Sequence, residues 1–269
     1  MRKRKFDFLF WGGVTYLVLL ALFAMFGPTF RHHYLEQVGQ PLQPSSATFW
    51  LGTDEIGRDV FARIAYGARL SLLIGLTVQA IALFIGVFVG VTGVYAPRWV
   101  AMPLMRFTDG MFAFPDILLA ILIIGVWKAG IIPVIVALSI TGWPGTARLV
   151  FTQVASLKDR EFVVASKALG ASTFYTVTRH VVPQLYGVLM AVTMISLAGT
   201  ILAESTLSFL GIGVQAPDPS WGSMINNARL QMNSYPSLLF WPCVVLSMTI
   251  FALNFVGDGI RAALDPKGR

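Results

Sequence analysis

The sequence is poor in charge and has one cysteine. Only 12% of its 269 residues are charged, whereas soluble domains carry about 25% charged residues. Hydrophobic residues make up 56% and the mean hydropathy is +0.71. These values exclude an ordinary soluble protein and predict an all-α polytopic membrane protein, with several helices packed together in lipid. The single cysteine, Cys243, excludes an intrachain disulfide and lies in an apolar run.

Sequence motifs for nucleotide, metal or catalytic chemistry are also lacking. There is no G-x-x-x-x-G-K-[ST], H-E-x-x-H or C-x-x-C, and paired catalytic carboxylates are not evident. Residues 211–216 and 257–262 fit G-x-G-x-x-A, but each follows an apolar span and not a strand of a βαβ unit. His32 and His33 have no further ligands at suitable spacing. The sequence therefore predicts no enzyme activity and no cofactor or metal in this chain.

Six apolar segments are candidates to cross the ~30 Å hydrocarbon core of a bilayer. They are residues 8–26, 71–95, 111–128, 129–147, 181–203 and 238–257. The third has only 11 residues between Asp116 and Lys128, so it must include Asp116 near one end, where the side chain can snorkel. Without this span the chain has five spans and its ends lie on opposite sides. Pro133, Gly142 and Pro144 predict an irregular fourth span.

The basic residues predict the orientation. The first apolar run follows MRKRK but has 19 residues and no A-x-A site, so we expect an uncleaved span and not a signal peptide. With six spans, 14 of the 20 Lys and Arg residues fall on the side that carries both termini. Cytoplasmic loops collect Lys and Arg. We therefore expect both termini in the cytoplasm, and we attribute the net charge of +7 to topology and not to nucleic-acid binding.

Two features stand out inside the spans. Gly86 and Gly90 form a G-x-x-x-G pattern, which lets helix backbones approach closely; we favour packing within the chain over a subunit interface. Glu204 is the one acid deep in the fifth apolar pattern. Intramembrane carboxylates are candidate functional sites, although Glu204 equally fits the outer interface.

Residues 159–183 form a polar, broken segment between apolar runs. Phe162, Ala165 or Ser166, and Leu169 recur at helical spacing and predict a short helix over residues 159–169. Gly170 stands where a helix ends with a left-handed residue.

A second short helix is predicted after this glycine. Ser172 is a good N-cap, Phe174, Val177 and Val181 share a face, and Pro183 suits the first turn of the next span. Helices this short are marginal alone. The segment therefore needs a partner, which is either the ends of its own spans or a second protein.

The same segment resembles a known motif. VASKALGASTFYTVTRHVVP is similar to the EAA loop of permease subunits in binding-protein-dependent ABC importers. Ala165, Gly170 and Pro183 match the motif, whereas its Glu is Val164 here and its second Ala is Ser166. Glu161, one helical turn earlier, is a candidate substitute for the missing acid.

Further segments resemble the dipeptide, oligopeptide and nickel group of these permeases, and its C-type subunit in particular. They are WLGTDEIGRDVFARIAYGARLSLLIG (50–75), MRFTDGMFAFPDILLAI (105–121), ILAESTLSFLGIGVQAPDPSWGSMI (201–225) and NFVGDGIRAALDP (254–266). The resemblance covers residues 50–266 in order. With the six spans expected above, we divide the chain into a first part over residues 1–69 and a core permease domain over residues 70–269.

The resemblance also implies partners. A second, homologous permease subunit would complete the pore, and an extracytoplasmic binding protein would deliver the substrate. Two ATP-binding subunits would bind ATP and Mg²⁺ and dock on the loops. The expected location is the plasma membrane of a prokaryote, the inner membrane if Gram-negative. Dipeptides and oligopeptides lead as substrates, with nickel chelates, opines and glutathione as alternatives; an ion-gradient-driven secondary transporter is a rival of another class.

The candidate site residues follow from these arguments. The coupling loop would use Glu161, Phe162, Val164, Ala165, Ser166, Lys167, Gly170, His180 and Pro183. Asp116 and Glu204 are the pore or gating candidates.

Overall fold

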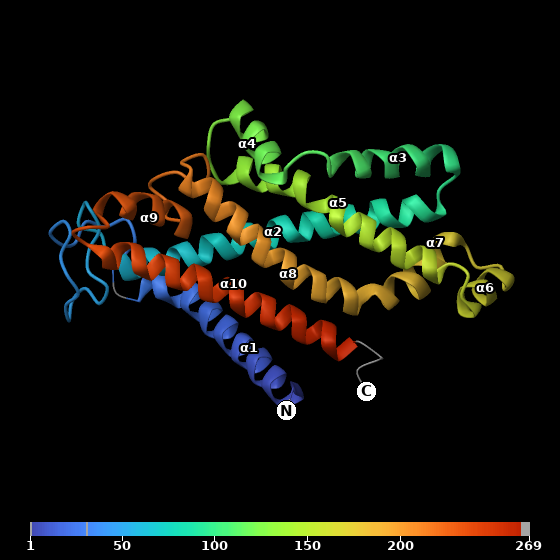
Figure 1. Cartoon of the computed structure of the whole chain (residues 1–269), viewed down its shortest axis with the longest axis horizontal. Coiled ribbons are helices and arrows are strands. Elements are labelled where there is room, and N and C mark those ends of the chain that lie inside the picture. The colour runs from blue at the N-terminus through green and yellow to red at the C-terminus, as the bar shows by residue number, and fades with distance from the viewer. Residues whose placement is uncertain (1, 31, 265–269) are drawn as a thin grey trace.

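The computed structural model describes residues 2–30 and 32–264, and this part of the chain contains helices and no strand. Figure 1 shows the helices arranged as an elongated bundle. They are α1 (Arg2–Phe26), η1 (Gly27–Thr29), α2 (Val60–Tyr95), α3 (Arg98–Met111), α4 (Asp116–Val126), α5 (Ile131–Leu157), α6 (Glu161–Ala168), α7 (Thr173–Thr176), η2 (Val177–Val181), α8 (Val182–Phe209), α9 (Trp221–Ala228), η3 (Arg229–Gln231) and α10 (Pro236–Leu264).

Five of the predicted spans are confirmed as long apolar helices: α1, α2, α5, α8 and α10. Each helix extends beyond the expected span at one end or both. The expected spans were delimited mainly by charged residues, and the helices continue through these residues. The α2 helix begins at Val60 and contains Arg63 and Arg69. The division expected between residues 69 and 70 thus falls inside α2.

The third span is different from the prediction. Residues 111–128 do not form one helix, because α3 and α4 meet at a 94° bend over residues 112–115. Only α4, with 11 residues, follows the bend. At 1.5 Å per residue it covers roughly 16 Å, which is too short to cross a bilayer alone. The number of spans is therefore five, or six if the bent pair counts as one.

The fourth span is one continuous helix. The α5 helix runs without a break over 27 residues and includes Pro144. Pro133 is its third residue, where a proline removes no intrahelical hydrogen bond. Pro144 in the interior has no N–H to donate to the Ile140 carbonyl, so the irregularity at this proline is a missing hydrogen bond and not a break in the helix.

The glycines of α2 set the packing of the bundle. A Cβ at Gly86 would lie 2.6 Å from Thr146 Cβ, and one at Gly90 would lie 2.6 Å from Val150 Cβ, both on α5. Gly75 faces α8 in the same way, 2.9 Å from Leu197 Cδ1. The G-x-x-x-G pattern thus serves packing within the chain, as favoured from the sequence.

The two ends of the bundle carry different structures. Segment 32–59 and α9 lie at one end, and α6 and α7 lie at the other (Figure 1). The start of α1 and the end of α10 lie beside each other, away from segment 32–59. The side of the membrane that each end faces stays a prediction.

Candidate functional site

The first helix of the predicted coupling loop, α6, is followed by a reversal of the chain at Gly170, as expected. Gly170 has φ of +81°, and its N–H donates to the Lys167 carbonyl at 2.9 Å. The Ala171 N–H donates to the Ser166 carbonyl at 3.2 Å. Together these two bonds form a Schellman motif, which requires a left-handed residue and favours glycine. No atom lies within 4 Å of the position of a Cβ at Gly170, so this glycine is needed for its backbone conformation and not for space.

The second half of the loop departs from the prediction. Ser172 is the N-cap of α7, and its Oγ accepts from the Tyr175 N–H at 3.2 Å. However, α7 has only four residues and continues through the π-helical turn η2 directly into α8. The loop is therefore one short helix, a glycine reversal, and the start of a long helix. Pro183 lies in the first turn of α8, as expected.

One face of this loop packs against its own spans. Val163 of α6 and Val181 of η2 are both fully buried, in a cluster with Val150 and Val154 of α5 and Leu185 of α8. Ser166 and Thr176 are buried and share a hydrogen bond of 3.0 Å between their hydroxyl oxygens. The loop is therefore fixed to the ends of α5 and α8.

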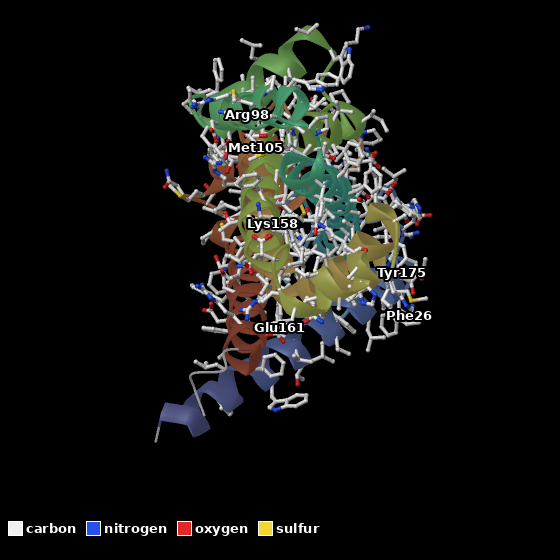
Figure 2. The ribbon with its side chains drawn as sticks, turned by 90° about the vertical axis from the view of Figure 1, so that its right-hand side faces the viewer. Phe26, Arg98, Met105, Lys158, Glu161 and Tyr175 are labelled. Carbon is white, nitrogen blue, oxygen red and sulfur yellow. The ribbon has the colours of Figure 1, made fainter. Side chains whose placement is uncertain are left out.

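The other face of the loop is exposed and apolar. The exposed side chains are Phe162 at 40%, Val164 at 53%, Leu169 at 88%, Phe174 at 79% and Tyr175 at 52%. Figure 2 looks onto this end of the molecule, where Lys158, Glu161 and Tyr175 lie at the surface. Among the described residues, the chain therefore covers one face of the loop and leaves the other uncovered, and docking of a second protein on the uncovered face stays a prediction.

The structure shows which side of α6 packs on the chain itself, a choice that the sequence left open. Phe162 and Leu169 face outward, and Val163 and Ser166 face inward. In an eight-residue helix both stripes have helical spacing, so periodicity could not choose between them. The sequence did not identify Thr176 as the hydrogen-bond partner of Ser166. The only signal for this pair was that Thr176 follows the chain reversal at Gly170 on the side that faces α6.

The remaining loop residues lie around this exposed face. Glu161 and Ala165 are exposed, and Glu161 occupies the first turn of α6. The Lys167 Nζ lies 5.3 Å from the centre of the Tyr95 ring, at the end of α2. The His180 ring meets the Tyr175 ring edge-on at 5.8 Å. The predicted residues are thus contiguous at one end of the bundle.

The two gating candidates have opposite surroundings. Asp116 is the exposed first residue of α4, beside the bend. Glu204 is fully buried in α8 and accepts hydrogen bonds from three serine hydroxyls. These are Ser208 at 2.8 Å, Ser71 of α2 at 3.1 Å and Ser205 at 3.4 Å. Glu204 therefore joins α2 to α8 within the bundle and is not at an open interface.

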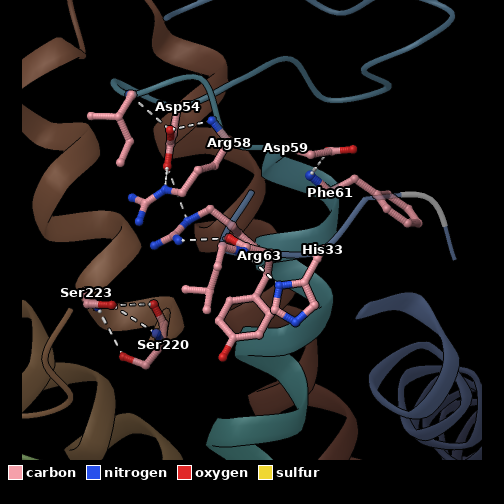
Figure 3. Close-up of polar contacts among 11 residues, drawn as sticks. His33, Asp54, Arg58, Asp59, Phe61, Arg63, Ser220 and Ser223 are labelled. Atoms are coloured by element: carbon pink, nitrogen blue, oxygen red, sulfur yellow. Dashed lines mark hydrogen bonds and ion pairs between the residues drawn. The ribbon is translucent and has the colours of Figure 1, made fainter. Parts of the chain in front are cut away.

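A polar network at the far end was not singled out from the sequence. The Asp54 carboxylate accepts from Arg58 Nε at 2.6 Å and lies 3.4 Å from Arg63 Nε (Figure 3). Arg63 is buried and also donates to the Tyr34 carbonyl at 3.3 Å. Burial, followed by contacts with Tyr66 and Asp218, raises the pKa of the Tyr34 phenol. This network folds segment 32–59 against the start of α2.

The histidine pair lies beside the start of α2. His32 Nδ1 lies 2.8 Å from Asp59 Oδ2, and Asp59 is the N-cap of α2. Within residues 2–30 and 32–264 there is no group of three or more His, Cys, Asp or Glu side chains that could hold a metal ion.

Comparison with known proteins places this architecture in a family. Residues 82–269 match the family described as "Binding-protein-dependent transport system inner membrane component". The fold of the permease in an inward-facing methionine ABC transporter is similar, with a TM-score of 0.61 at 19% identity over 74% of this chain and 95% of that one. The chain belongs to this family of multi-pass bacterial ABC importer permeases, as the sequence predicted.

Individual relatives are similar over nearly the whole chain. The dipeptide transport system permease protein DppC of Bacillus subtilis is 38% identical over all of this chain and 85% of its own. The oligopeptide permease OppC of the same organism is 39% identical over 96% of this chain and 85% of its own. The glutathione permease GsiD of Pectobacterium atrosepticum is 35% identical over 94% and 84%.

Proposed function

We propose that this chain forms half of the translocation pore of an ATP-driven importer of dipeptides or oligopeptides. The similarity to dipeptide and oligopeptide permeases over nearly the full length supports this substrate class. Glutathione is the second candidate, since glutathione permeases are 35–36% identical. A second, homologous permease subunit completes the pore, and an extracytoplasmic binding protein delivers the substrate.

The exposed apolar face of α6 and α7 is the observation that carries this proposal. Its side chains are held in place by the buried Val163, Val181 and Ser166–Thr176 contacts behind it. A fixed apolar surface at the end of a bundle is suited to a protein partner. Because this chain has no P-loop of its own, ATP must be bound by another protein, and we assign the partner as the ATP-binding subunit. Two such subunits bind ATP and Mg²⁺.

The connections of the loop provide a path for coupling. From α7 the helix runs through η2 into α8, and the buried side of α6 contacts the end of α5. Movement of the loop would therefore displace both spans together. Near the other end of α8, Glu204 joins this helix to Ser71 of α2, and at that end segment 32–59 and α9 form the surface for the binding protein.

Reconstitution with the two ATP-binding subunits and the binding protein tests the proposal. Leu169→Asp places a charge in the exposed face and should abolish peptide-stimulated ATP hydrolysis and uptake. Leu169→Met is the matched control, because it keeps an apolar side chain at the same position, which is 88% exposed. Uptake that persists without ATP and stops with an ionophore would favour a secondary transporter and overturn the proposal.

A further inference from the structure

An apolar groove lies between α1 and α10. Its volume is about 430 Å³, within the ~300–1,000 Å³ range of small-molecule sites. Aromatic, aliphatic and glycine residues line it: Phe8, Leu9, Gly12, Gly13 and Tyr16 from α1, and Met248, Phe251, Ala252 and Phe255 from α10. The only side-chain oxygen in this lining belongs to Tyr16.

Two adjacent glycines shape the groove. A Cβ at Gly13 would lie 3.0 Å from the Ala252 carbonyl oxygen and 3.2 Å from Val256 Cγ2, so the helices touch there. A Cβ at Gly12 would meet no atom within 4 Å. The hollow thus opens at Gly12, on the outer surface of the bundle, between the exposed side chains of Phe8 and Phe251.

The one side-chain oxygen in the groove is already hydrogen-bonded within the protein. The Tyr16 hydroxyl donates to the Val245 carbonyl at 3.1 Å and lies 3.2 Å from Thr249 Oγ1. The Tyr16 end of the groove is therefore closed by an aromatic ring whose polar atom already has partners. An unbranched hydrocarbon chain suits such a surface, whereas a peptide would leave its backbone groups unpaired.

The opposite end of the groove adjoins a basic cluster. The α1 helix begins at Arg2, and its first residues are Arg2, Lys3, Arg4 and Lys5, the last of which stands three positions before Phe8. Gly259 of α10 lies against the Phe10 side chain of α1, so Arg261 in the last turn of α10 adds a fifth positive charge near the start of α1. Asp7 and Asp258 are the acids in the same stretches, so positive charge is in excess. Basic clusters beside a span attract anionic lipid headgroups.

We propose that this groove binds one acyl chain of an anionic phospholipid, whose headgroup lies at the end of the groove near Arg261 and the basic sequence with which α1 begins. The apolar groove matches the acyl chain of such a lipid, and the adjacent positive charges match its anionic headgroup. The site differs from the general lipid layer in its selectivity for headgroup charge.

Filling the groove tests the acyl-chain part. Gly12→Leu adds a side chain into the hollow, and its Cβ would have no atom within 4 Å. Gly199→Leu is the matched control, because Gly199 on α8 is exposed and also has no atom within 4 Å of its Cβ position. The full chain is purified in micelles that contain equal amounts of phosphatidylglycerol and phosphatidylcholine, and native mass spectrometry counts the lipids retained. We expect preferential retention of phosphatidylglycerol in the wild type and in Gly199→Leu, and its loss in Gly12→Leu.

Removing the charges tests the headgroup part. Replacement of Arg2, Lys3, Arg4 and Lys5 by Gln should lower the preference for phosphatidylglycerol roughly fivefold for each charge removed. Equal retention of the two lipids by the wild type overturns the proposal, as does unchanged selectivity in Gly12→Leu. If Gly12→Leu instead weakens association with the second permease subunit and leaves lipid retention unchanged, the groove is a subunit interface and the proposal is wrong.

Discussion

The hydroxyl groups of Ser166 on α6 and Thr176 on α7 share a buried hydrogen bond of 3.0 Å across the Gly170 reversal. This bond and the burial of Val163 give the loop one fixed orientation on α5 and α8. The family motif has Ala where this chain has Ser166. The replacement thus adds a contact within the loop, and the missing acid at Val164 does not leave the segment loose.

Removing one hydroxyl of this pair should loosen α6. Ser166→Ala leaves the Thr176 hydroxyl buried without its partner, at a cost of about 1–3 kcal/mol. Ser166→Ala combined with Thr176→Val removes both groups, and the cost should be smaller than the sum of the two single changes. Hydrogen exchange of the α6 amides measures the local stability. Strict additivity of the two changes would show that the bond contributes nothing.

The conformation of Gly170 gives a second prediction. Valine at φ near +81° should cost about 1–2 kcal/mol, because the left-handed region disfavours a Cβ. We expect Gly170→Val to reorient α6 and to uncouple ATP hydrolysis from peptide uptake in the reconstituted complex.

Gly211 provides the control for that experiment. It has φ of +80° and, like Gly170, open space around its Cβ position, but it lies at the far end of α8. Gly211→Val should lower the thermal stability by a similar amount and leave the number of ATP molecules per transported peptide unchanged. Normal coupling in Gly170→Val would remove the basis for the coupling role.

Features that depend on a residue and its neighbours in the chain could be predicted from the sequence, whereas features that depend on contacts between distant helices could not. Gly170 and Ser172 were recognised because a left-handed C-terminus and an N-cap depend on the residue itself. The five long spans followed from composition. The burial of Val163 in place of Phe162 could not be predicted, because it depends on contacts with α5 and α8. The bend between α3 and α4 was missed as well, because hydropathy alone does not show a change of direction within an apolar segment.

The close approach of α2 and α5 predicts a packing defect. Gly90→Ala places a Cβ 2.6 Å from Val150 Cβ and 2.7 Å from the Ala147 carbonyl oxygen, so the helices must separate. Overpacking of this kind costs about 1–3 kcal/mol. Gly142→Ala is the control, since its Cβ would make an ordinary contact of 3.7 Å with Ala82. Thermal unfolding in detergent compares the two, and equal melting temperatures would contradict the role of Gly90 in packing.

The serine cluster around Glu204 predicts graded effects. Glu204→Gln keeps the size and one acceptor oxygen, and the serine hydroxyls can rotate to accept from its amide. Glu204→Leu leaves the hydroxyls of Ser71 and Ser208 without this partner, at about 1–3 kcal/mol for each buried group that stays unpaired. We expect Glu204→Leu to lower the melting temperature much more than Glu204→Gln. Equal effects would mean that the charge of Glu204, and not its hydrogen bonds, holds α2 to α8.

The polar network of Asp54, Arg58 and Arg63 gives the largest predicted loss of stability. Asp54→Asn neutralises the carboxylate that lies 3.4 Å from Arg63 Nε, and the buried guanidinium then has no counter-charge at that position. Breaking a buried ion pair from one side costs about 3–5 kcal/mol. Glu55→Gln is the control, because Glu55 is only partly buried and lies beside the same network. Limited proteolysis of segment 32–59 measures the effect: Asp54→Asn should be cleaved much faster than the wild type, and Glu55→Gln should not. Resistance of Asp54→Asn to cleavage would show that the backbone contacts of the segment suffice to hold it on α2.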